Sequence, residues 1–198
     1  MTEEGRGEHR YQAFFCEENV WHLCGDPAIP DPIRAAVFMS NAARAVAVAQ
    51  QRIAPIPGFP VVWDYHVVMV SRPADDPAWR VWDLDSTLPM GAPLPLWLDE
   101  SFGGAWGFGE HHAPRFRVIE ARAFRSVLQS DRSHMRDDDG QWIQPPPPWP
   151  TIGEGRGSNL MRLVDMDDDV AGTVTTREGL AAVLASMQAQ SSGSSNAP

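Results

Sequence analysis

The sequence predicts one mixed α/β (α+β) domain with a central, mostly antiparallel sheet flanked by helices. The chain has 198 residues, 43% of them hydrophobic, which suits a single domain with a full core. Segments with helical spacing of apolar residues alternate with short apolar runs typical of strands. The strand-like segments 61–70 and 79–84 are joined by a short loop, so we expect them to pair antiparallel.

The predicted domain covers residues 11–187. Residues 1–10 are polar and residues 188–198 are of low complexity, so we expect both to be disordered tails. The start of the chain lacks the apolar segment of a signal peptide. No run of about 18 apolar residues is present, so we expect a cytoplasmic protein without a membrane partner.

The first half of the domain is expected to contain one helix and several strands. Residues 16–24 are predicted to be helical, because four residues recur on one helical face: Cys16, Val20, Leu23 and Cys24. Residues 34–51 are ambiguous. Their alanines favour a helix, whereas valines that alternate around Ser40 favour two strands and a turn, which is the interpretation adopted. Residues 61–70 form a Val-rich run typical of a buried strand.

The second half is expected to begin with an irregular segment. Residues 85–114 are rich in proline and glycine, and a short strand at 116–120 and a helix at 122–130 follow them. Prolines 145–148 force an extended segment, which we interpret as a rigid strap across the domain rather than a docking motif. Residues 175–178 resemble a capping box that opens a last helix.

Charge and cysteine content exclude several classes of function. The net charge of −10 argues against nucleic acid and anionic membranes as partners. The two cysteines, Cys16 and Cys24, are not spaced for CxxC redox chemistry and make a weak zinc site. No motif for a metal, nucleotide or flavin is present, so we expect no cofactor and no metal. We also expect a monomer.

The strand at 61–70 contains a histidine, which is the first candidate for chemistry. Burying a titratable group costs free energy unless the group is hydrogen-bonded or serves in catalysis. His66 is therefore a candidate general base. Asp83 and Asp85 follow on the neighbouring strand and share one face of it. Either carboxylate could orient the imidazole, and the spacing does not separate the two.

Cys16 is the candidate nucleophile. It stands at the start of the predicted helix, where unpaired N–H groups and the helix dipole favour an anion, so we expect its pKa to be lowered. Cys24 lies on the last turn and is assigned to the core. Each candidate also has a structural interpretation: Cys16 as a small core residue, His66 as a bonded structural histidine, and the two aspartates as a strand-ending turn.

Several ordered segments resemble the protein N-terminal glutamine amidohydrolase family. They include a Cys-Glu-Glu-Asn-Val-Trp block and a Trp-Asp-Tyr-His-Val block, and the resemblance extends over roughly residues 11–165. The six segments are residues 14–24, 63–68, 81–89, 116–119, 130–135 and 142–150. Phe15 and Trp82 stand where the family usually has tyrosine, and residues 153–165 match poorly.

The resemblance implies a papain- or transglutaminase-like cysteine hydrolase. The implied triad is Cys16 as nucleophile, His66 as base and Asp83 as orienting acid. The implied reaction converts the N-terminal glutamine of a protein or peptide into glutamate and ammonia through a thioester. Thiol enzymes that act on internal glutamine, and non-catalytic binders of protein N-termini, are the alternatives that remain.

An enzyme that recognises a protein N-terminus needs a negatively charged group to bind the α-ammonium. Glu17, Glu18 and Asp64 adjoin the proposed catalytic residues and are candidates, although the two glutamates could simply complement the helix dipole. Residues 131–134 could border the site. We favour a structural role for them, in which Asp131 caps a turn and Arg132 pairs with a carboxylate.

Overall fold

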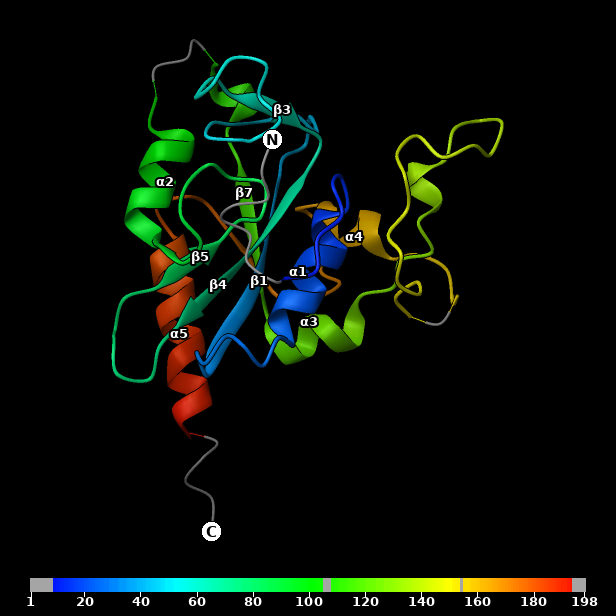
Figure 1. The fold of residues 1–198 in the computed structure, drawn as a ribbon. Coiled ribbons are helices and arrows are strands. Elements are labelled where there is room, and N and C mark those ends of the chain that lie inside the picture. Colours follow the sequence, from blue (N-terminus) through cyan, green and yellow to red (C-terminus); the bar gives the residue numbers. More distant parts are fainter. Residues whose placement is uncertain (1–8, 105–107, 154, 194–198) are drawn as a thin grey trace.

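The computed structural model describes residues 9–104, 108–153 and 155–193, with side chains described up to residue 187 (Figure 1). Most of the predicted N-terminal tail and residues 194–198 lie outside the described residues. His9, at the edge of that tail, bonds Asp26 at 2.7 Å between Nδ1 and Oδ2. Across the described ranges, no helix combines the length and hydropathy needed to cross a bilayer.

A six-stranded antiparallel sheet forms the centre of the fold, in the order β6-β5-β4-β1-β7-β8. Its strands are β1 Ile33–Ser40, β4 His66–Arg72, β5 Arg80–Trp82, β6 Ala92–Pro93, β7 Arg115–Glu120 and β8 Thr173–Thr175. A second sheet of two strands consists of β2 Val46–Val48 and β3 Val61–Trp63. The prediction of a central antiparallel sheet is confirmed.

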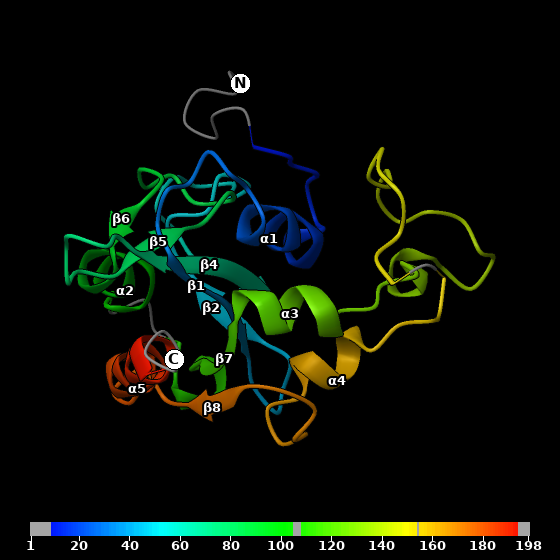
Figure 2. The ribbon, with the colours of Figure 1, turned by 90° about the horizontal axis from the view of Figure 1, so that it is seen from below.

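Helices cover both faces of the large sheet (Figure 2). One face packs against α1 Cys16–Cys24, α3 Ala121–Val127 and α4 Leu160–Val164, and the other against α2 Leu94–Phe102 and α5 Leu180–Gly193. Alternate residues of β1 serve the two cores, with Phe38 on the α1 side and Val37 on the α2 side. This two-sided burial explains why the central strands are apolar at nearly every position.

The predicted strand at 61–70 is wrong as a single element. The chain leaves β3 after Trp63, turns at Asp64, and enters β4 at His66 in the other sheet. Two bonds stabilise this turn: Ser40 Oγ donates to the Asp64 carbonyl at 2.7 Å, and the Tyr65 N–H donates to the Asp64 carboxylate at 2.9 Å. A continuous apolar run conceals such a break, because both strands are built from the same residue types.

The ambiguous segment 34–51 is confirmed as two strands, although they do not pair with each other. β1 pairs with β4 and β7, whereas β2 pairs with β3. β5 pairs antiparallel with β4, as predicted from the short loop. The strand at 116–120 and the helix that follows are also confirmed as β7 and α3.

Three predictions in the second half of the chain need correction. Residues 85–114 include the helix α2, which carries a proline in its first turn and buries Trp97. The last helix, α5, begins at Leu180 rather than after the capping box, because Thr175 belongs to β8 and pairs with Phe116. α5 also includes residues 188–193, which the sequence assigned to the C-terminal tail.

Candidate active site

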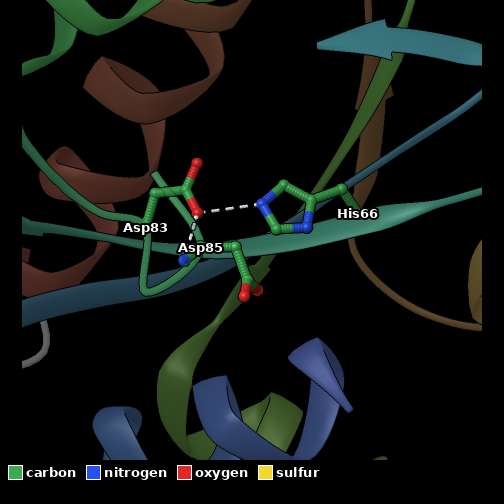
Figure 3. Close-up of side chains that lie close together, drawn as sticks. All are labelled: His66, Asp83 and Asp85. Carbon is green, nitrogen blue, oxygen red and sulfur yellow. Dashed lines mark hydrogen bonds and ion pairs between the residues drawn. The ribbon is translucent and has the colours of Figure 1, made fainter. Parts of the chain in front are cut away.

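His66 and Asp83 form a buried pair at the junction of β4 and the loop after β5 (Figure 3). The imidazole Nε2 lies 2.9 Å from Asp83 Oδ1. The other oxygen, Oδ2, accepts bonds from Gln51 Nε2 and Trp97 Nε1, each at 3.3 Å. Asp85 accepts a bond from the Tyr11 hydroxyl at 2.6 Å instead. The structure therefore separates the two aspartates that the sequence left equivalent.

The pair shifts both pKa values in the direction that suits a catalytic base. Burial alone would lower the pKa of His66, but the charge and hydrogen bond of Asp83, together with the charge of Asp85, outweigh burial, and the net pKa is raised. Burial would likewise raise the pKa of Asp83, but the imidazole and several hydrogen bonds lower it. An ionised Asp83 accepts a hydrogen bond from the Nε2–H group, which leaves Nδ1 as the nitrogen that can take a proton.

Trp63 stabilises the orientation of the imidazole from a second direction. Its ring stacks on His66 with centroids 5.7 Å apart and planes 16° apart. Neither composition nor spacing indicated a role for Trp63. Trp63 is the last residue of β3 and His66 is the first residue of β4. The contact between their rings therefore depends on the break between the two strands, which the sequence did not predict.

Cys16 lies in the same cavity as His66. It is the first residue of α1, it is 9% exposed, and it lines a cavity of about 360 Å³. The other lining residues are Phe14, Arg44, Trp63, Asp64, Tyr65, His66, Asp85, His134, Met135 and Met161. A thiol and an imidazole from distant parts of the chain thus share one small, partly enclosed space.

The predicted lowering of the Cys16 pKa is wrong for this structure. Burial raises the pKa of the thiol well above its ordinary value, and the carboxylates of Glu17, once it has ionised, and Asp85 add to the increase. A backbone hydrogen bond from Val67 acts in the opposite direction but does not prevail. In the resting site Cys16 is therefore a thiol, and ionising it requires transfer of its proton to a neighbouring base.

Glu17 is fully buried beside Cys16. Burial is the main cause that raises its pKa to about 8, so its carboxyl is mainly protonated at neutral pH. Its Oε2 accepts a bond from the Tyr65 hydroxyl at 3.0 Å and lies 3.9 Å from the Cys16 sulfur. Its Oε1 lies 3.7 Å from His134 Nε2. The sequence did not predict this polar cluster behind the thiol.

Glu18 is committed to a buried ion pair. Arg132 Nε and Nη2 each donate to one of its oxygens at 2.8 Å, and Trp149 Nε1 donates at 2.7 Å. Arg132 also donates to the carbonyl of Pro147 at 3.3 Å, so the proline segment is tied to α1 through this residue. The predicted pairing of Arg132 with a carboxylate is confirmed, as is the turn in which the Ser133 N–H donates to Asp131.

One group of side chains has the composition of a metal site. Potential ligand atoms of His66, Asp83 and Asp85 all lie within 4.8 Å of one another (Figure 3). His66 Nε2 and Asp83 Oδ1 already satisfy each other, however. The arrangement is therefore accounted for by an acid that orients an imidazole.

A helix-borne cysteine and an aspartate-bound histidine share one cavity on this α/β scaffold, an arrangement typical of hydrolases that use a cysteine. The chain belongs to the N-terminal glutamine amidase family, whose sequence model matches residues 11–184.

Three curated relatives carry the name protein N-terminal glutamine amidohydrolase. The chain is 37% identical to the Caenorhabditis briggsae protein over 163 residues, which cover 80% of this chain and 85% of the relative. It is 34% identical to the Bos taurus protein over 165 residues, covering 81% and 79%. It is 35% identical to the Homo sapiens protein over 165 residues, covering 81% and 80%.

Proposed function

We propose that this protein hydrolyses the side-chain amide of an N-terminal glutamine to give glutamate and ammonia, with Cys16, His66 and Asp83 as its catalytic residues. Membership of the amidase family supports the reaction. The observation that carries the residue assignment is the cavity that Cys16 shares with a histidine already bound to Asp83.

The reaction begins with transfer of the Cys16 proton to His66 Nδ1, because the resting thiol has a raised pKa. The thiolate attacks the amide carbon and a C–S bond forms, while the carbonyl electrons move to oxygen. The N–H of Cys16, at the start of α1, is a donor for this oxyanion. The tetrahedral intermediate collapses, the C–N bond breaks, and His66 returns the proton so that ammonia leaves.

Hydrolysis of the thioester completes the cycle. His66 takes a proton from water, the hydroxide adds to the thioester carbon, and Cys16 leaves as the thiol once the proton returns. Asp83 stabilises the imidazolium in both halves of the cycle. Asparagine is disfavoured by geometry, because its amide is one methylene short of the sulfur and a displacement of about 1 Å can cost about 10²-fold in rate.

The test compares wild type with Cys16→Ser on a peptide that begins with glutamine. We expect ammonia release and the mass change of one amide-to-acid conversion with wild type only. A parallel peptide with an acetylated N-terminus should not react. Equal turnover of the free and acetylated peptides would refute recognition of the N-terminus, and full activity of Cys16→Ser would refute the thiol mechanism.

We also propose that the enzyme is cytosolic and monomeric and acts on proteins or peptides. Both cysteines are free thiols, which is the state expected in a reducing compartment. Size-exclusion chromatography with light scattering would test the monomer, and an elution mass of two chains would refute it.

A further inference from the structure

A substrate with an N-terminal glutamine differs from one with an internal glutamine by the charge of its α-ammonium group. This inference rests on the proposed function. Four bonds separate the α-nitrogen from the amide carbon, so the two atoms lie at most about 5 Å apart. When the amide is at Cys16, the ammonium must therefore lie within the same cavity or at its rim, next to an anion.

The two glutamates of α1 cannot supply that anion. Glu18 is 0% exposed and its charge is balanced by Arg132. Glu17 is also 0% exposed, it does not line the cavity, and with a pKa of about 8 it is mainly neutral at neutral pH. Two of the three carboxylates that the sequence offered are thus excluded by burial and pairing.

Asp85 lines the cavity but is poorly placed for a cation. It is bound to the Tyr11 hydroxyl, and a carboxylate oxygen lies within 4.8 Å of the potential ligand atoms of His66 and Asp83. A substrate cation held there would oppose the positive charge that His66 must acquire during the reaction. Such a site would bind the substrate at the expense of catalysis.

We propose that Asp64 binds the α-ammonium group of the substrate. Its side chain is exposed and lines the cavity two residues before His66, so a peptide bound to it can continue into solvent. The Ser40 hydroxyl holds its carbonyl, and the Tyr65 N–H holds its Oδ1. These two bonds orient the carboxylate before the substrate arrives, which reduces the entropy lost on binding.

The one arginine of the cavity wall does not neutralise this carboxylate. Arg44 directs Nη1 toward Met161 Sδ at 3.4 Å, and no ion pair joins it to Asp64 within the described part of the chain. His134, which also lines the cavity, has its pKa lowered by burial despite the opposing charge of Asp64, so it is mainly neutral at neutral pH. The Asp64 carboxylate can therefore bind a positively charged ligand.

The test uses two peptides that differ only in the α-amine. One begins with glutamine, and the other carries a glutaramoyl group, which is glutamine without its amine. We expect Asp64→Asn to lower kcat/KM for the glutamine peptide about 10- to 100-fold, because a charge-assisted bond is lost. Its kcat/KM for the glutaramoyl peptide should not fall, because no ammonium contact is lost there and the removed charge is one that raises the pKa of Cys16. Asp138→Asn, an exposed acid outside the cavity wall, is the matched control and should change neither value.

The ratio of the two kcat/KM values decides the matter, because misfolding would lower both together. An Asp64→Asn enzyme that keeps the wild-type ratio would overturn the assignment of the ammonium site while leaving the proposed reaction intact. A wild-type enzyme that releases ammonia from neither peptide would refute the proposed function itself, and this inference with it.

Discussion

Glu17 allows a direct measurement of the electrostatics beside the Cys16 thiol. It is fully buried, and its pKa is raised from about 4.5 to about 8 mainly by burial. The folded protein thus holds a proton that the unfolded chain releases between these two pH values. Glutamine has the same shape without a titrating group, and its carbonyl can accept the bond from Tyr65.

The size of the effect follows from proton linkage. Because the folded state binds more protons than the unfolded state in this window, the free energy of unfolding falls as the pH rises. Each pH unit corresponds to about 1.4 kcal/mol, so the span from 4.5 to about 8 amounts to on the order of 5 kcal/mol. The stabilising contribution is complete below pH 4.5 and is lost above pH 8. A loss of this size is a large part of a total stability of about 5–15 kcal/mol.

The assay is urea unfolding of wild type and Glu17→Gln at several pH values from 5 to 9. We expect the substituted protein to gain stability relative to wild type as the pH rises, with most of the change complete near pH 8. Glu100→Gln, an exposed glutamate on α2, is the control and should run parallel to wild type. A Glu17→Gln protein whose stability tracks wild type across the whole range would refute the raised pKa.

Two further predictions concern the ion pairs of the site. Asp83→Asn should reduce kcat/KM by about 10²- to 10⁴-fold. It should also move the acidic limb of the pH–rate profile to lower pH, because the carboxylate that raises the His66 pKa is gone; an unmoved limb would contradict the assignment. Arg132→Met should lower the free energy of unfolding by about 3–5 kcal/mol, since it leaves Glu18 buried without its partner. Denaturant unfolding measures this, and adding Glu18→Gln should recover most of the loss.

The sequence could single out the candidate catalytic residues because their local signals are strong. A cysteine opens a helix, and a histidine stands in an apolar strand, so each residue is conspicuous without any knowledge of the fold. Spacing alone could not decide between Asp83 and Asp85. Alternation predicts that both lie on one strand face, but β5 ends at Trp82 and both lie in the loop after it. There Gln51 and Trp97 donate to Asp83, which is the carboxylate that contacts the imidazole.

The missed elements share a physical cause. The helix α2 lies in a segment rich in proline and glycine, and it is stabilised by the burial of Trp97 rather than by helix propensity. The break at Asp64 depends on Ser40, which is 24 residues earlier in the chain. Long-range contacts of this kind leave no periodic signal in the sequence, so propensity and spacing cannot reveal them.

The pKa of Cys16 shows how substrate binding and activation are connected. Negative charges, including that of Asp64, contribute to the raised pKa of the thiol. An α-ammonium bound at Asp64 cancels part of that negative potential and so makes the thiolate easier to form. A site arranged in this way remains a neutral thiol when it is empty, which limits oxidation and alkylation of the sulfur. The charge that marks an N-terminus would then serve both to hold the substrate and to favour ionisation of the nucleophile that attacks it.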